Sequence, residues 1–495
     1  MYIGDYKINP KKSIHIIGIG GIGMSGLSKL LHKNQFLVQG SDIKENSQIK
    51  ELRKLGIHIF IGHHSKNISN CDLIVKSSAI KNDNEEIKEA KNKSIPLISR
   101  AELLSNIMQD SYNICITGAH GKTSTTSLVY SILKSIDIDP TVICGGIINS
   151  INSNVAKGSE NVNVVEADES DGTFIVLPTN ISIITNIDAE HLDYYGNLQN
   201  IINVYTLYID KCLLKDLVIT CNDCKNLKQI NTKHVNHQKL ISYGTDSENC
   251  DIKAINLKNT NKGVKFDILI SKKGQKILSQ DINIIKNILL KNYGKHNILN
   301  ALSAIIIYLF KGGKRHLINS ALKNNSGVKR RFTNIGKINN INFIDDYAHH
   351  PSEIKATLEV AKEHASINCG KIIAVFQPHR YSRLKDLYDQ FLTSFGQADS
   401  LIVLDVYAAG ETSINNISAN HFVKDIKKTF INAFYCRNIT ELENKIIHLS
   451  NPRDQVVFMG AGNISDIAKE LFNRYHLKTT TKLQNTYRVS YRKDI

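Results

Sequence analysis

Short apolar runs alternate with longer amphipathic segments from the start of the chain. Residues 13–17, 37–40 and 73–76 are mainly apolar runs, whereas residues 24–32 and 85–93 carry apolar side chains at helical spacing. Apolar runs bounded by turn residues predict buried strands, and the spaced pattern predicts helices. Strands that alternate with helices in this way predict a doubly wound, parallel α/β sheet.

The same alternation returns in the middle and last parts of the chain. The further predicted strands are residues 95–98, 114–116, 162–165, 181–185, 217–220, 343–344, 371–376, 401–404 and 455–459. Residues 125–133 and 294–310 predict helices, and residues 252–271 predict antiparallel strands. A chain of this length is expected to form about two to four domains.

The stretch from Thr117 to Ser124 reads T-G-A-H-G-K-T-S and lies between a predicted strand and a predicted helix. A glycine-rich turn at a helix N-terminus directs backbone N–H groups at an anion and predicts a phosphate cradle. Lys122 would neutralise phosphate charge, and the Thr123 hydroxyl would bind Mg²⁺. The full P-loop pattern would require glycine at Ile116, so a structural turn with a solvated lysine is the alternative. The residues predicted to bind the nucleotide here are Gly118, Ala119, His120, Gly121, Lys122, Thr123 and Ser124.

Acidic residues and a histidine follow the next two predicted strands. Glu166 opens the segment E-A-D-E-S-D, and His191 lies within N-I-D-A-E-H-L-D. Functional groups of parallel α/β sheets gather beyond the carboxyl ends of the strands. Either residue alone would be read as a surface polar group, but together, beside the phosphate cradle, they predict a Mg²⁺–nucleotide site.

A second glycine pattern, G-x-G-x-x-G, begins at Gly18 directly after the first predicted strand. Asp42 follows the next strand, where an acidic residue of this motif meets a ribose. The pattern indicates a nucleotide diphosphate, which both NAD and UDP-sugars contain. The residues predicted to bind this ligand are Gly18, Gly20, Gly21, Gly23, Ser41, Asp42, Ser78 and Arg100.

These motifs predict three α/β domains. We expect a Rossmann-like nucleotide-binding domain at residues 1–107, a P-loop ATPase-like domain at residues 108–326, and a second Rossmann-like domain at residues 327–478. A basic tail at residues 479–495 follows them.

The composition narrows the range of partners. The net charge of +16 makes nucleic acid a candidate, but the lysines are spread along the chain and no RNP-type, zinc-finger or basic-zipper pattern accompanies them. A basic surface that attracts anionic nucleotides is the simpler interpretation, and we expect no nucleic-acid partner. The nine cysteines are scattered, as in reducing compartments. No apolar run approaches the ~18 residues of a membrane span, so we expect a cytoplasmic enzyme without membrane contact.

The segments G-A-H-G-K-T-S, E-A-D-E-S-D and N-I-D-A-E-H-L-D-Y-Y-G resemble the ATPase core of the Mur ligases. These enzymes use ATP to add amino acids to UDP-N-acetylmuramic acid during peptidoglycan synthesis. The resemblance implies ATP and Mg²⁺, with Thr123 as a ligand of one Mg²⁺ and Glu166 and His191 as ligands of a second. Ala119 replaces a threonine that is usual in the family's loop.

Two further motifs extend the resemblance around the nucleotide. The segment H-N-I-L-N-A resembles the family signature H-N-x-x-N-A, which implies that Asn297 and Asn300 approach ATP. The segment G-V-K-R-R-F resembles the family's hinge, which implies that Arg331 reaches the ATP phosphates. Without the resemblance, the first motif would be read as a polar helix N-terminus.

The last third carries D-D-Y-A-H-H-P, Q-P-H-R-Y-S-R, D-V-Y-A-A-G-E and G-A-G-N-I, which resemble the family members that attach L-alanine. The resemblance implies that Tyr347 and His349 shape a small amino-acid pocket. It also implies that His379, Arg380 and Arg383 hold the muramyl carboxylate and the incoming alanine, since the arginine fork pairs a carboxylate bidentately. The implied substrates are UDP-N-acetylmuramate, bound by the domain at residues 1–107, and L-alanine, bound by the domain at residues 327–478. The enzyme would act as a monomer or homodimer. The catalytic residues so implied are Lys122, His191, His349, Arg380 and Arg383.

Three alternatives remain open at this level. The first glycine pattern also fits an NAD-dependent dehydrogenase, although this leaves the G-A-H-G-K-T loop unexplained. The basic charge also fits a nucleic-acid-dependent ATPase. A sibling ligase that attaches a tripeptide to the same UDP-sugar would share most of the motifs.

Overall fold

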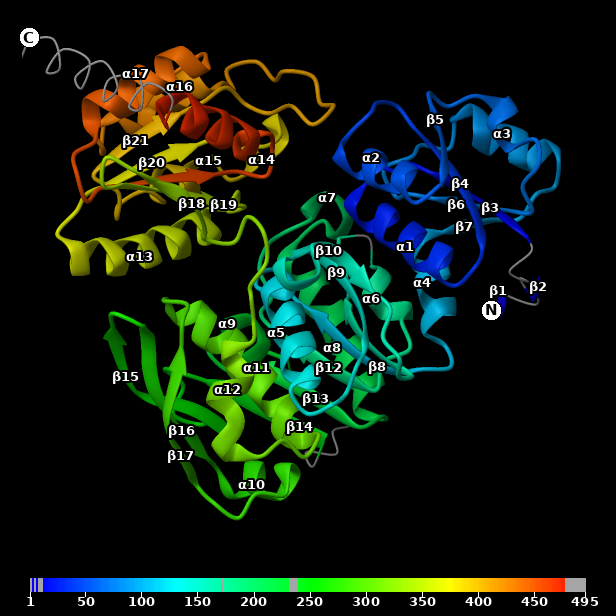
Figure 1. The fold of residues 1–495 in the computed structure, drawn as a ribbon, viewed down its shortest axis with the longest axis horizontal. Helices are drawn as coiled ribbons and strands as arrows, with labels where there is room; N and C mark the ends of the chain where they lie inside the picture. The colour runs from blue at the N-terminus through cyan, green and yellow to red at the C-terminus, as the bar shows by residue number, and fades with distance from the viewer. Residues whose placement is uncertain (1, 4–5, 8–11, 171, 231–238, 477–495) are drawn as a thin grey trace, which may run out of the picture. The chain divides into compact units, whose positions relative to one another are not determined.

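The computed structural model describes residues 2–3, 6–7, 12–170, 172–230 and 239–476 (Figure 1). The predicted tail at residues 479–495 lies outside them. The chain divides into two compact units, the first made of residues 1–258, 264–291 and 295–328, and the second of residues 259–263, 292–294 and 329–495. No helix of the described residues is long and apolar enough to cross a membrane.

The first unit begins with a parallel sheet in the order β5-β4-β3-β6-β7. Its strands are β3 Ser13–Ile17, β4 Leu37–Asp42, β5 His58–Ile61, β6 Leu73–Lys76 and β7 Leu97–Ser99, and a short antiparallel pair, β1 Tyr2–Ile3 and β2 Tyr6–Lys7, precedes them. Its helices are α1 Ile22–Lys33, α2 Ser47–Lys54, α3 Glu85–Asn92 and α4 Arg100–Met108, with a 3-10 helix at Ser65–Ile68. The strand order reverses between β3 and β6, so the glycine pattern after β3 lies at the crevice where such sheets bind ligands.

The same unit continues with a ten-stranded sheet in the order β10-β9-β11-β8-β12-β13-β14-β15-β16-β17. The strands are β8 Tyr112–Thr117, β9 Thr141–Ile148, β10 Ser153–Ala156, β11 Val162–Glu166, β12 Ile181–Ile184, β13 Leu217–Cys221, β14 Leu240–Gly244, β15 Ile252–Thr260, β16 Gly263–Ile270 and β17 Ile284–Leu290. The helices are α5 Lys122–Lys134, α6 Thr173–Val176, α7 Leu192–Tyr195, α8 Leu198–Leu213, α9 Lys225–Lys228, α10 Lys272–Leu278, α11 Lys295–Phe310 and α12 Ile318–Lys323, and 3-10 helices lie at Asn149–Ile151 and Arg315–Leu317. Because β8 pairs in parallel with both β11 and β12, the carboxyl ends of these three strands lie side by side.

The second unit holds a sheet in the order β18-β19-β23-β20-β21-β22, parallel except for β18 against β19. Its strands are β18 Thr333–Ile338, β19 Ile341–Asp346, β20 Ile372–Phe376, β21 Ser400–Val403, β22 Ala433–Tyr435 and β23 Gln455–Met459. Its helices include α13 Pro351–Asn368, α14 Tyr381–Asp386, α15 Tyr388–Leu392, α16 Ala419–Ile426 and α17 Ile439–Leu449.

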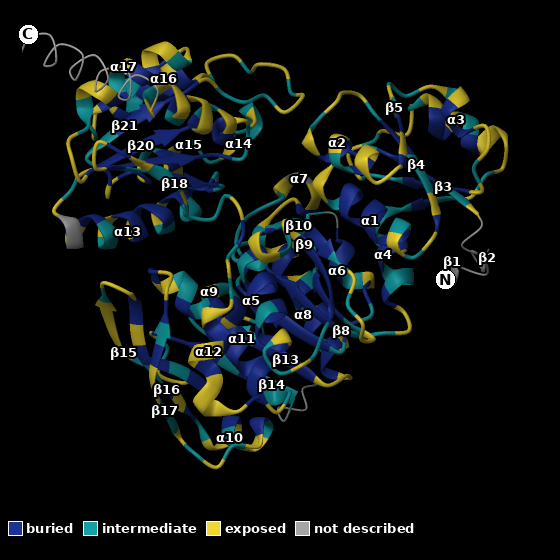
Figure 2. Cartoon of the chain, in the orientation of Figure 1, coloured by how far each residue is buried: buried dark blue, intermediate teal, exposed yellow. Residues whose placement is uncertain are grey.

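The central strands of this second sheet are buried on both faces (Figure 2). On β20, Ile372, Ala374 and Phe376 pack into one apolar cluster, whereas Ile373 and Val375 pack into another. Successive side chains of a strand point to opposite faces, so helices must cover both sides of the sheet. This explains why the strands appear in the sequence as continuous apolar runs.

The fold class predicted from the sequence is confirmed. Some elements, such as β9 and the long helix α8, were not predicted, and other differences lie at element ends. Helix α5 begins at Lys122 instead of residue 125, because Gly121 in the left-handed conformation (φ 82°) forms its N-cap. Strands β4 and β11 continue past their apolar runs to Asp42 and Glu166, since the parallel ladder extends to these polar residues. Polar side chains therefore stand at the very ends of the strands.

Candidate active site

The phosphate loop is closely packed against the neighbouring strand end. An added Cβ at Gly118 (φ 125°) would lie 2.2 Å from Thr185 Oγ1, and one at Gly121 would lie 2.7 Å from Asn300 Oδ1. Only glycine fits at these two positions, as in a loop where backbone must approach a ligand closely. The contact also places Asn300 of α11 beside the loop.

Asn186 holds this loop in shape. Its Oδ1 accepts a hydrogen bond from the His120 N–H at 2.8 Å, its Nδ2 donates to the His120 carbonyl at 2.9 Å, and its own carbonyl accepts from the Ala119 N–H at 3.1 Å. The Thr185 hydroxyl donates to the same His120 carbonyl at 2.7 Å. Asn186 was not among the residues predicted from the sequence, although Asn186 is the first residue of the N-I-D-A-E-H segment.

Lys122 lies in the first turn of α5 and is surrounded by acceptors. Its Nζ donates to the carbonyls of Gly118 at 2.6 Å and Ala119 at 3.0 Å, and to Glu169 Oε1 at 2.8 Å. Burial alone would lower the pKa of Lys122, but the charge of Glu169, supported by two neighbouring carboxylates, raises it above its ordinary value. The side chain is therefore a firmly protonated cation inside the loop.

Glu166 reaches Thr123 from the adjacent strand. The Thr123 hydroxyl donates to Glu166 Oε1 at 2.9 Å, and the Gly145 N–H donates to Glu166 Oε2 at 2.6 Å. The structure thus brings together two of the three metal ligands that the resemblance implied.

The third implied ligand, His191, lies among carboxylates that the sequence analysis did not single out. Its Nε2 is 3.3 Å from Glu169 Oε1 and 3.6 Å from Glu190 Oε2. The ligand atoms of these three residues all lie within 4.8 Å of one another. Burial would lower the pKa of His191, but its hydrogen bond and charge interaction with Glu169, together with the charge of Glu190, raise it.

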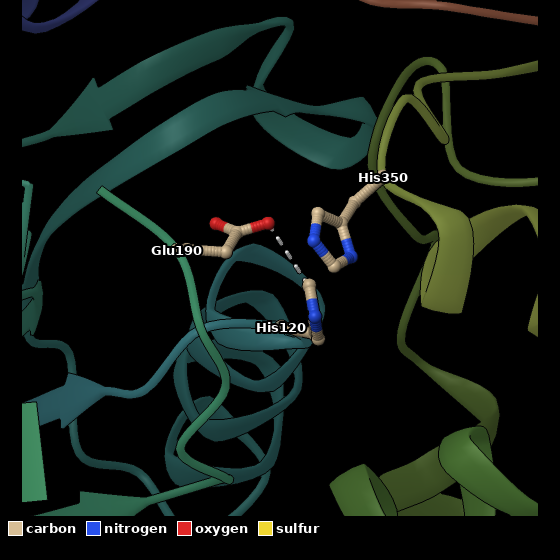
Figure 3. A group of neighbouring side chains, drawn as sticks. All are labelled: His120, Glu190 and His350. Atoms are coloured by element: carbon tan, nitrogen blue, oxygen red, sulfur yellow. Dashed lines mark ion pairs between the residues drawn. The ribbon is translucent and has the colours of Figure 1, made fainter. Parts of the chain in front are cut away.

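Glu190 also links this group to the phosphate loop. Its Oε1 is 3.8 Å from His120 Nδ1, and Figure 3 shows the two side chains facing each other. On its other nitrogen, His120 pairs with Asp188 Oδ2 at 3.1 Å. The side chains of Asp188 and Glu190, which follow β12, therefore fix the position of His120. Both acidic residues lie within three positions of His191 in the sequence, and this clustering could have identified them.

The donor set at this edge fits a divalent cation bound to a nucleotide. A threonine hydroxyl, the carboxylates of Glu166, Glu169 and Glu190, and one imidazole meet around Lys122. Carboxylate and hydroxyl oxygens are preferred by Mg²⁺, which is usually completed by substrate phosphates.

The glycine loop of the N-terminal sheet is held by Asp42. Its Oδ2 accepts a hydrogen bond from the Gly20 N–H at 2.8 Å, and an added Cβ at Gly20 would lie 2.6 Å from Asn46 Nδ2. Asp42 thus has a structural role in addition to the predicted contact with a ribose. The Ser41 hydroxyl is buried and donates to Glu86 Oε2 at 2.6 Å.

Arg100 joins this glycine loop to the acidic segment of the central sheet. An added Cβ at Gly23 would lie 3.3 Å from Arg100 Nη1, and Arg100 Nη2 is 3.3 Å from Asp168 Oδ2. Arg100 therefore links the predicted UDP-sugar site to the acidic segment that follows β11. Ser78 is exposed in the turn after β6, beyond the same sheet edge.

In the second unit, the residues predicted to line the amino-acid pocket form a series of ring contacts, two of them edge-to-face and one stacked. The ring centroids of Tyr347 and His349 are 5.1 Å apart, those of His349 and His379 are 6.1 Å apart, and His379 stacks on Tyr407 at 5.5 Å. Arg383 Nη1 lies 3.2 Å from His379 Nδ1. Burial and the charge of Arg383 lower the pKa of His379 to about 4, so its ring is neutral near pH 7. Tyr407 was not predicted, although it lies in the quoted D-V-Y-A-A-G-E motif.

The remaining predicted residues lie at element ends. Arg380 is exposed and has a positive φ of 69° as the N-cap of α14. Arg331 pairs with Glu353 Oε1 at 3.6 Å within the second unit. Asn297 is half-buried in the first turn of α11, and Ser124 in the first turn of α5.

Comparison with known proteins assigns the family. Residues 13–112 match the family model described as "Mur ligase family, catalytic domain", residues 116–308 match "Mur ligase middle domain", and residues 330–462 match "Mur ligase, glutamate ligase domain". A UDP-N-acetylmuramate–L-alanine ligase of Rickettsia bellii is 42% identical over 94% of this chain and 96% of its own. The one of Rickettsia rickettsii (strain Sheila Smith) is 43% identical over 94% of this chain and 95% of its own.

A solved structure agrees with these relatives. The UDP-N-acetylmuramate–alanine ligase MurC of Thermotoga maritima has a TM-score of 0.77 and 30% identity, covering 94% of this chain and 100% of its own. A murein peptide ligase of Psychrobacter arcticus shares the fold, with a TM-score of 0.67 and 21% identity over 94% of this chain and 98% of its own. The chain therefore belongs to the Mur ligase family.

Proposed function

We propose that this chain joins L-alanine to the carboxylate of UDP-N-acetylmuramate at the expense of ATP, in the cytoplasmic stage of peptidoglycan biosynthesis. The observation that carries the proposal is the half-buried Lys122 in a glycine loop, with Thr123, Glu166 and the Glu169–Glu190–His191 group on the same sheet edge. The relatives with 42–43% identity over nearly the whole chain support the choice of substrates.

The chemistry follows from the poor reactivity of a carboxylate. A carboxylate does not acylate an amine at neutral pH, because its oxygen is a poor leaving group. In the proposed reaction, the substrate carboxylate oxygen attacks the γ-phosphorus of ATP, the bond to the bridging oxygen breaks, and ADP leaves. The alanine nitrogen then attacks the acyl carbon of the acyl phosphate, loses a proton, and displaces inorganic phosphate.

The residues of the central sheet serve the first step. Two anions must approach each other, and the fixed positive charge of Lys122 offsets their repulsion at the transferring phosphoryl group. Two Mg²⁺ ions, one that Thr123 would hold and a second that Glu166 and His191 would hold, would neutralise charge on the nucleotide's phosphate oxygens when bound. The ATP phosphates would compete with Glu169 for Lys122. When ATP binds, Lys122 would therefore exchange the Glu169 carboxylate for a phosphate group.

The residues of the second unit serve the amino acid. The ring cluster formed by Tyr347, His349, His379 and Tyr407 offers a small, largely apolar wall, and Arg380 and Arg383 offer forks for carboxylates. The neutral ring of His379 does not repel an incoming ammonium group.

The test is ADP release by the purified chain with ATP, Mg²⁺ and UDP-N-acetylmuramate against a panel of amino acids and the tripeptide of the sibling ligases. We expect turnover with L-alanine and at least about 100-fold lower kcat/KM with the tripeptide, as expected when a site rejects groups it cannot accommodate. A preference for the tripeptide would refute the assigned substrate, and ADP release that depends on DNA or RNA instead would refute the ligase assignment.

A further inference from the structure

The loop that carries His379 and Arg380 is tied to the segment that follows β21. The Arg380 N–H donates to the Tyr407 carbonyl at 2.9 Å, and the Tyr407 N–H donates to the Pro378 carbonyl at 2.8 Å. A few residues further along both segments, Glu411 accepts from the Ser382 N–H at 3.0 Å and from the Ser382 hydroxyl at 2.6 Å. Backbone bonds thus hold one end of the turn, and a single carboxylate holds the other.

The turn between these two anchors has an unfavourable backbone conformation. Arg380 has φ 69° and ψ 138°, a region that residues with a Cβ rarely adopt. Such a conformation persists only where the surrounding contacts impose it, and it often marks a functional site. Arg380 is exposed, so its guanidinium is accessible to a ligand.

Glu411 carries a negative charge, which strengthens its hydrogen bonds to Ser382. Burial would raise the pKa of its carboxyl group, but the two bonds from Ser382 and the charge of Arg380 lower it. The side chain is therefore an anion that accepts two hydrogen bonds from one residue, and charge-assisted bonds of this kind are stronger than neutral ones.

We propose that Glu411 is a positioning residue of the ligation: by holding Ser382 it imposes the turn at Arg380 and directs that guanidinium at a substrate carboxylate. Glu411 bonds to Ser382 and acts through its neighbours instead of touching substrate. The inference rests on the proposed function and deepens it, because it names the residue that positions Arg380 for binding the substrate.

The experiment compares variants in the ADP-release assay, once the wild-type chain has shown turnover that depends on UDP-N-acetylmuramate and L-alanine. We expect Glu411→Ala to lower kcat/KM for L-alanine or the UDP-sugar by about tenfold or more, as small misplacements of a catalytic group do, with the KM for ATP nearly unchanged. Glu411→Gln should recover most of the activity, because its amide oxygen can accept from the Ser382 N–H and its amide N–H can donate to the Ser382 hydroxyl.

Glu441→Ala is the matched control. The Glu441 carboxylate also accepts from backbone N–H near a helix N-terminus, from Arg437 at 3.0 Å, but it lies on α17. This variant should keep wild-type kinetics, so a loss that follows Glu411→Ala alone is not a general effect of removing such a carboxylate from the domain.

A double-mutant cycle with Arg380→Ala separates positioning from folding. If Glu411 acts through Arg380, adding Glu411→Ala to Arg380→Ala should cost about twofold or less, because contacting residues that act as a unit are not additive. Equal losses in both backgrounds, a raised KM for ATP with a lowered melting temperature, or wild-type kinetics in Glu411→Ala would each overturn the proposal. Absence of turnover in the wild-type chain would instead refute the proposed function, and the inference with it.

Discussion

Replacing Gly118 with alanine tests whether the phosphate loop has the close packing seen in the structure. The added Cβ would lie 2.2 Å from Thr185 Oγ1, and 2.8 and 2.9 Å from the backbone oxygen and nitrogen of Asn186. The Thr185 hydroxyl cannot turn away freely, because it donates to the His120 carbonyl at 2.7 Å. The backbone of Asn186 cannot move without disturbing the bonds that shape the loop.

The expected loss of stability has two parts. A residue with a Cβ in the left-handed region costs about 1–2 kcal/mol. Forcing extra volume into a packed site costs about 1–3 kcal/mol. We therefore expect Gly118→Ala to lower the free energy of unfolding by about 2–5 kcal/mol, and to reduce ligase activity further because the loop must shift.

Gly312→Ala is the matched control, since Gly312 has φ 85° in the same compact unit and an added Cβ would meet nothing within 4 Å. It should show only the backbone part, about 1–2 kcal/mol, and full activity. Urea unfolding followed by circular dichroism gives the free energies, and the ADP-release assay gives the activity. Equal destabilisation in the two variants, or an active Gly118→Ala enzyme, would refute the packing argument.

Three further predictions concern charge. Lys122→Ala should abolish the phosphate release that depends on L-alanine, and near-normal turnover would remove the loop from the mechanism. Glu166→Ala should raise the Mg²⁺ concentration needed for half-maximal activity steeply, and an unchanged titration would count against its role as a ligand. Burial raises the pKa of Asp346 to about 6 in the folded protein. Its folded pKa lies above the unfolded value of about 3.9, so its contribution to stability should grow as pH falls from about 6 to about 4. Asp346→Asn should lack this gain in urea unfolding, and identical pH slopes for variant and wild type would contradict the assignment.

Much of the fold could be predicted from local patterns. Apolar runs located most of the strands, because a strand buried on both faces carries its apolar side chains in one continuous run. Helical spacing located α1, α3, α5 and α11, whereas helices such as α8 and α17 were not predicted. The glycine loops could be located as well, since the residues that form a turn between a strand and a helix are consecutive in the sequence. Helix α5 started earlier than predicted because the left-handed Gly121 allows the helix to begin directly at Lys122.

Sequence by itself determined which residue types stand at the strand ends of this protein, including Lys122, Glu166 and His191. Only the tertiary structure decided their partners: Glu169 for Lys122, Thr123 for Glu166, and Glu169 with Glu190 for His191. The reason is physical. The order of strands in a sheet is set by packing between distant segments, and this order, not spacing along the chain, determines which side chains come within hydrogen-bond distance.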